Sequence, residues 1–164
     1  MKKFLVILMI IGILTGCSDV KNSNSIAAGR YFDMIEILKN NEQFEDSSNY
    51  FDISYEVSKI NDGYRYYVFM DNPRIAMYDI KIIVIEDGVD FSEVMAGNIG
   101  IFEDGSYNMI PNQTNIEKGF VKGLSVSGIT DKADTSLKVM ITWQDKLLSV
   151  TSREFFRFNL NYGE

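Results

Sequence analysis

The residue types that most often carry enzyme chemistry are scarce in this sequence. It has 164 residues, no histidine and a single cysteine, Cys17. Histidine is the commonest general base and a common metal ligand, so its absence removes much acid–base and metal chemistry. No Gly-x-Ser-x-Gly motif supplies an activated serine. We therefore expect a protein that is not an enzyme.

Carboxylates are the remaining groups that could do chemistry. Asp87, Asp90 and Glu93 form one acidic run, and Glu103 and Asp104 form another. Calcium requires about 6–8 oxygen ligands, and the chain lacks the Asp-x-Asp-x-Asp-Gly spacing of a calcium loop. Acidic residues in loops are mostly solvated turn residues. We therefore expect no metal site and no bound cofactor.

Cys17 ends an N-terminal stretch with the features of a leader. Lys2 and Lys3 make its start positive, and an apolar run, FLVILMIIGIL, extends from Phe4 to Leu14. These eleven residues would make a helix of ~16 Å, too short for a hydrocarbon core of about 30 Å. The run therefore predicts a signal peptide rather than a membrane-spanning helix. An ordinary signal peptide with a small-residue cleavage site is the alternative to the motif described next.

Leu14-Thr15-Gly16-Cys17 resembles the lipobox of bacterial lipoproteins, in which an aliphatic residue and two small residues precede the cysteine. The resemblance covers residues 1–17 only. It implies cleavage of residues 1–16 as a signal peptide and transfer of a diacylglyceryl group to the Cys17 thiol. The chain would then be lipid-anchored at the extracytoplasmic face of the cell membrane. Two acyl chains make a durable anchor, because each buried CH₂ contributes about 0.8 kcal/mol.

The charge balance narrows the class of partner. Without residues 1–16 the chain has 14 basic and 23 acidic residues, a net charge of −9. This surplus of acid disfavours nucleic acid, because phosphates need cations. It also disfavours a domain lying flat on an anionic membrane. A negative surface keeps a domain soluble, and the alternative is that it attracts a basic partner.

Two segments are expected after the cleavage site. Residues 17–25 form the lipidated cysteine and a flexible tether, since Ser18 to Ser25 is short and polar. An eight-residue coil averages roughly 16 Å, so the domain would stay close to the membrane. Residues 26–164 then form a single globular domain, long enough to fold without a disulfide.

The domain is predicted to begin with an amphipathic helix over residues 26–41. Tyr31, Met34, Ile35 and Leu38 follow the i, i+3, i+4, i+7 spacing of one helix face. This apolar face would pack on the domain's own sheet or, alternatively, on a partner.

The rest of the chain has the pattern of β-strands. Asn61-Asp62-Gly63 predicts a hairpin turn between two of them, because Asp-Gly supplies positive φ. The candidate strands are residues 51–58, 64–70, 77–86, 99–102, 119–129, 137–143 and 147–160. Their spacing predicts a mainly β fold, an antiparallel, Ig-like β-sandwich preceded by the helix. The alternative is an α+β fold in which one curved antiparallel sheet packs on the helix.

The most recognition-like cluster is Tyr64, Arg65, Tyr66 and Tyr67 in the second candidate strand. Two of the tyrosines share a strand face, and the third faces the other way with Arg65. Tyrosine and arginine are frequent interface anchors, and tyrosine rings also stack on sugars. The alternative is that these aromatic residues are core residues.

Two polar loops add candidate partner-binding residues. One is the turn Asn72-Pro73-Arg74, and the other is the loop Asn112-Gln113-Thr114-Asn115. Their side chains are well suited to hydrogen bonding. The candidate partner-binding residues are therefore Tyr64, Arg65, Tyr67, Arg74, Asn112 and Gln113.

These features predict a membrane-anchored bacterial lipoprotein that acts by non-enzymatic protein binding or assembly near the outer face of the membrane. An accessory subunit of an envelope or secretion apparatus is one example. The alternative is an immunity or inhibitor lipoprotein that neutralises a secreted toxin. A calcium- or sugar-binding module is the third hypothesis.

Overall fold

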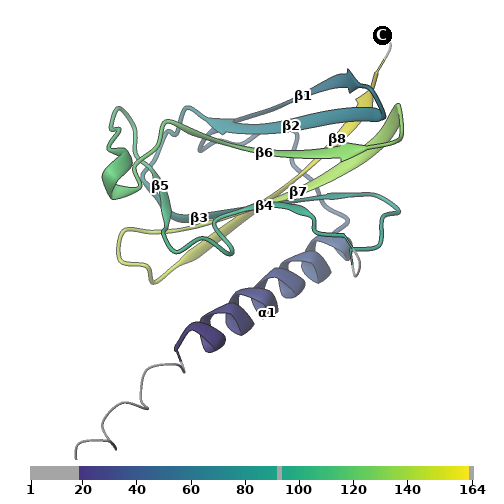
Figure 1. Ribbon diagram of the computed structural model, residues 1–164. Helices are drawn as coiled ribbons and strands as arrows, with labels where there is room; N and C mark the ends of the chain where they lie inside the picture. The colour runs from purple at the N-terminus through teal and green to yellow at the C-terminus, as the bar shows by residue number, and fades with distance from the viewer. Residues whose placement is uncertain (1–18, 92–93, 163–164) are drawn as a thin grey trace, which may run out of the picture.

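Two antiparallel β-sheets lie face to face in the computed structural model, which describes residues 19–91 and 94–162 (Figure 1). The three-stranded sheet has the order β1 (Asp52–Ile60), β2 (Gly63–Asp71), β6 (Gly123–Thr130). The other has the order β4 (Gly97–Ile99), β3 (Met77–Glu86), β7 (Asp134–Gln144), β8 (Thr151–Asn161), and β5 (Tyr107–Met109) also pairs with β3. The predicted β-sandwich with one helix is confirmed. The proposed lipobox lies outside the described residues.

The core between the sheets is built by alternation along each strand. On β2, Tyr66, Val68 and Met70 are buried, whereas Arg65 and its alternate neighbours are not. Successive side chains of a strand point to opposite faces, so one face of β2 enters the core and the other faces out. The ring of Phe51 packs edge-on against Trp143 and Phe156 with centroid distances of 5.8 and 5.9 Å.

β3 is buried on both faces because it lies between two hydrophobic clusters. Ile82 and Val84 point into the core between the sheets, and Ile83 and Ile85 point to the opposite side, where the helix packs. This double burial explains why β3 reads as a nearly continuous apolar run.

The helix α1 (Asp19–Lys39) covers the outer face of the five-stranded sheet (Figure 1). Its predicted stripe is buried and belongs to one cluster with residues of β3 and β7. The stripe therefore packs on the domain's own sheet. The buried helix residues are Tyr31, Met34, Ile35 and Leu38.

The helix begins earlier than the sequence pattern predicts. Residues 19–25 are helical rather than coiled, so the prediction of a flexible tether over residues 17–25 is wrong for this part. Once the buried stripe has formed a helix, each further residue adds a hydrogen bond without a second nucleation cost. The N-terminal end of α1 points away from the sandwich (Figure 1).

The irregular half of the chain differs most from prediction. Of the strand predicted at residues 99–102, only Ile99 lies in a strand, the three-residue β4, and β5 and the 3-10 helix η2 (Ile116–Lys118) were not predicted. The last candidate strand begins at Thr151, because residues 145–150 form the turn between β7 and β8. The predicted hairpin at Asn61-Asp62-Gly63 is confirmed, since Ile60 pairs with Gly63 and Gly63 has a φ of 133°.

Candidate functional site

The outer face of the three-stranded sheet is open, whereas α1 covers the outer face of the other sheet (Figure 1). The outward residues of the central strand β2 are Arg65, Tyr67 and Phe69, none of them fully buried. We call this surface the aromatic face. Its members are Arg65, Tyr67 and Phe69 of β2, Ser54, Glu56 and Ser58 of β1, and Ser125, Ser127 and Ile129 of β6.

A stacked aromatic pair lies at the centre of this face. The rings of Tyr67 and Phe69 have centroids 6.0 Å apart and planes 17° apart. Each ring stands opposite small or polar residues on both neighbouring strands, Tyr67 between Glu56 and Ser127. The surface thus combines a flat apolar centre with hydroxyl groups around it and a charged group of each sign.

The predicted tyrosine cluster is divided between the two faces of β2. Arg65 and Tyr67 lie on the aromatic face, as their shared register requires. Tyr64 lies on the other face, half-buried, with its ring 4.9 Å from that of Tyr162. Tyr66 is a core residue, and burial, followed by the charge of Glu86, raises the pKa of its hydroxyl to about 12.

Phe69 is a surface residue that the sequence analysis did not single out. It lies two residues beyond Tyr67 and four beyond Arg65, so the same period of two places all three side chains on one face. The signal was present in the sequence, but a phenylalanine in a strand is usually assigned to the core.

The two polar loops named from the sequence meet at one end of the sandwich. Residues 71–73, 110 and 112–114 line a groove of about 510 Å³, together with Val121 and Lys122. The groove adjoins the aromatic face, because its residue Asp71 follows Phe69 by two positions on β2. The structure therefore brings Asn112 and Gln113 together with Asn72 in the groove, and places Arg65 and Tyr67 on the aromatic face of β2.

Arg74 does not line this groove. Its guanidinium pairs with the carboxylate of Asp52, to which the amide of Asn72 also donates a hydrogen bond of 2.8 Å. The hydrogen bonds from Asn72 and Arg74 hold the pKa of Asp52 below its usual value. Arg74 therefore fixes the turn rather than presenting a charge to the groove.

The first acidic run is largely explained by internal contacts. Asp87 pairs with Lys138 at 3.0 Å, and Glu93 lies outside the described residues. The neighbouring Glu86 is buried and accepts hydrogen bonds from the hydroxyls of Thr130 and Thr135. Its carboxylate also forms an ion pair with Lys132. A buried carboxylate that has hydrogen-bond and ion-pair partners of this kind stabilises the fold.

Residues 19–91 and 94–162 contain no helix long and apolar enough to cross a membrane. In the same residues, no group of three or more His, Cys, Asp or Glu side chains is placed to hold a metal ion. Comparison with protein-family models, with curated proteins and with solved structures finds no match for this chain.

Proposed function

We propose that this chain is a bacterial lipoprotein that binds another envelope protein through its aromatic face and catalyses no reaction. A diacylglyceryl group on Cys17 would anchor it at the outer face of the membrane. The observation that carries the proposal is the open aromatic face, with Tyr67 stacked on Phe69 beside Arg65. Aromatic residues and arginine are the usual anchors of protein interfaces.

A protein partner suits the shape of this surface better than a small molecule does. Small ligands occupy concave pockets that bury most of their surface. The aromatic face is the outer side of a three-stranded sheet, and its hydroxyl and charged groups form the polar surroundings of an interface. A segment of a partner would cover the stacked pair and use the serines for hydrogen bonds.

The turn between β7 and β8 supports a membrane-facing orientation. Its side chains Leu147, Leu148 and Val150 are 82%, 58% and 58% exposed. The turn lies on the same side of the molecule as the N-terminal end of α1 (Figure 1). Exposed apolar side chains of this kind suit the boundary between headgroups and acyl chains.

The anchor is tested by metabolic labelling with a fatty acid. The wild type should incorporate label and the Cys17→Ala variant should not. Equal labelling of both proteins would contradict the lipobox.

The binding surface is tested by photo-cross-linking in cells. A photoreactive residue at Ser127, on the aromatic face, should capture a defined neighbour, whereas one at Ile116, exposed on η2, should not. Tyr67→Ser should abolish capture from Ser127, because it removes one ring of the stacked pair. Capture of the same neighbours from both positions would contradict the assignment of the aromatic face as the binding surface. Capture of one secreted toxin would identify the protein as an inhibitor.

A further inference from the structure

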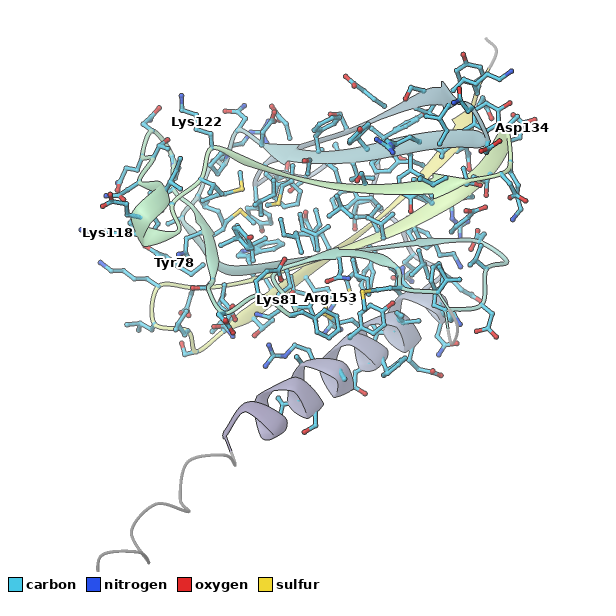
Figure 2. The ribbon with its side chains drawn as sticks, viewed as in Figure 1. Tyr78, Lys81, Lys118, Lys122, Asp134 and Arg153 are labelled. Carbon is cyan, nitrogen blue, oxygen red and sulfur yellow. The ribbon has the colours of Figure 1, made fainter. Side chains whose placement is uncertain are left out.

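A small pocket between α1 and the five-stranded sheet gathers three cationic side chains. It has a volume of about 230 Å³, and its lining includes Arg30 of α1, Lys81 of β3 and Arg153 of β8. Figure 2 shows Lys81 and Arg153 close together on the side of the sheet that faces α1. The same pocket contains one carboxylate, that of Asp79. Its net charge is therefore positive in a chain whose total charge is −7.

The register of the sheet places a hydroxyl between two of these cations. Lys81 stands opposite Thr142 on β7, and Thr142 stands opposite Arg153 on β8. Directly opposite residues of antiparallel strands share a face, and neighbouring strands are about 4.8 Å apart. The three residues thus form a transverse row, with the backbones of Lys81 and Arg153 roughly 10 Å apart.

The charges of this row are only partly compensated. The ammonium group of Lys81 lies 2.5 Å from Oδ2 of Asp79, and its side chain is only 9% exposed. Within residues 19–91 and 94–162, no ion pair or side-chain hydrogen bond uses Arg30 or Arg153. One carboxylate therefore balances the buried lysine and leaves two guanidinium groups without an internal anion.

The hydroxyl of Thr142 is also without an internal partner. Thr142 is 7% exposed, and its hydroxyl makes no hydrogen bond with any residue that the structure describes. Among the described residues, the buried side-chain atoms without a hydrogen-bond partner are Ser136 Oγ and Glu154 Oε2, so the Thr142 hydroxyl is not one of them and stays accessible from the pocket. Because Thr142 lines the pocket, its hydroxyl is available to form a hydrogen bond with a ligand bound there.

We propose that this pocket binds a phosphate group. Guanidinium groups donate paired N–H bonds to phosphate oxygens, an ammonium group adds a point charge, and a threonine hydroxyl adds a further donor. Arg153, Thr142 and Lys81 supply these donors from the sheet, and Arg30 supplies a second guanidinium from the helix above it. The volume is smaller than that of pockets for drug-sized ligands, which begin at about 300 Å³.

The phosphate has two chemical sources, a phospholipid headgroup or the free ion. The apolar turn at residues 145–150 connects β7 to β8, the strands of Thr142 and Arg153, which favours the headgroup. The lipid source rests on the proposed membrane anchorage, whereas the anion site itself does not.

Trp143, the only tryptophan of the chain, adjoins Thr142 and is part of the pocket lining, while its ring packs against Phe51 in the core between the sheets. Its fluorescence therefore reports binding indirectly, through a change in the packing around β7. The full chain is purified in a phosphate-free detergent and titrated with inorganic phosphate, with chloride at matched ionic strength as the control. We expect a saturable change that chloride does not produce. A change that does not saturate, or that chloride reproduces, would overturn the site.

Variants test the assigned residues. Arg30→Gln and Arg153→Gln should each weaken phosphate binding about tenfold, because each removes charged hydrogen bonds. Thr142→Val should also weaken it while keeping the side-chain shape. Lys118→Gln, a charge change on the exposed η2, should leave it unchanged. Equal effects of Arg153→Gln and Lys118→Gln would show general screening and exclude the pocket.

The source is distinguished in bilayers. Transfer of the full chain into phosphatidylglycerol nanodiscs should change the Trp143 signal without added phosphate, and transfer into nanodiscs of a phosphate-free glycolipid should not. If the protein instead responds equally to added phosphate in both kinds of nanodisc, the ligand is the free phosphate ion. If Cys17 carries no lipid but the phosphate titration saturates, the proposed anchorage fails and the anion site stands.

Discussion

Tyr66 shows how burial at a single residue makes stability depend on pH. Tyr66 is 5% exposed, and the pKa of its hydroxyl is about 12 in the folded protein against about 10 in an unfolded chain. The folded state thus favours the neutral phenol. This contribution is complete below pH 10 and is lost as the pH rises from about 10 to about 12.

We expect wild-type protein to lose about 2 kcal/mol more unfolding free energy between pH 9 and pH 12 than Tyr66→Phe does, since each pKa unit corresponds to about 1.4 kcal/mol. Urea unfolding at the two pH values measures the difference. The other tyrosines titrate in both proteins, so the comparison isolates Tyr66. Parallel losses in the two proteins would contradict a buried, neutral phenol.

Gly100 illustrates a backbone requirement at a single position. Its φ is 77°, and an added Cβ would lie 2.2 Å from the carbonyl oxygen of Ile80. Gly100→Ala should therefore lower the free energy of unfolding by at least ~2 kcal/mol, from the left-handed conformation and the steric overlap together. Gly105→Ala is the matched control, because nothing lies within 4 Å of its added Cβ and its φ is not positive. Equal melting temperatures for the two variants would refute this explanation.

At the scale of elements, α1 is one helix with two kinds of support. Its C-terminal part is held by buried side chains, whereas residues 19–25 continue the helix away from the sandwich. Ile26 lies at the junction and is exposed. A proline there removes a backbone hydrogen bond and obstructs the preceding turn, at a cost of about 3 kcal/mol.

Ile26→Pro should therefore reduce the helical circular dichroism of α1 by about a third, since residues 19–25 are seven of its 21 residues. The melting temperature of the sandwich should not change, because the buried stripe begins at Tyr31. Lys21→Pro, in the first turn, should have little effect on either measurement. A loss of the whole domain on Ile26→Pro would show that this segment supports the core.

The elements that sequence patterns predict are those with strong local periodicity. The stripe of α1, the alternation of β2 and the Asp62-Gly63 turn are properties of a few consecutive residues, and each prediction is confirmed. β4 and β5 have three residues each and exist through pairing with β3, so no local pattern marks them. The row of Lys81, Thr142 and Arg153 depends on the register of three strands, which a single sequence does not specify.

At the scale of the whole molecule, the layers place different surfaces on opposite sides. The aromatic face and α1 lie on opposite sides of the sandwich, and the β7–β8 turn lies on the side of the N-terminal end of α1 (Figure 1). In the proposed anchored protein, the turn would meet the membrane and the aromatic face would remain accessible. This arrangement would separate the surface proposed to touch lipid from the surface proposed to touch a partner.

This orientation predicts a difference in depth. A bimane attached to Leu148→Cys should be quenched by headgroup nitroxide lipids, and one on Ser127→Cys should not. A lipidated Cys17 would leave the introduced thiol as the only reactive one. Equal quenching at the two positions would contradict the orientation.

The early start of α1 has a consequence for how an anchored domain would meet its partner. A flexible tether would let the domain point in every direction, and complex formation would then have to remove that rotational freedom. Association costs an estimated 4–15 kcal/mol in lost translation and rotation. A helix that runs without interruption from Asp19 into the packed stripe restricts the angles available to the domain before any encounter. Part of the entropy of recognition would then be lost during folding rather than during binding, so a modest contact area could hold a partner in the same membrane.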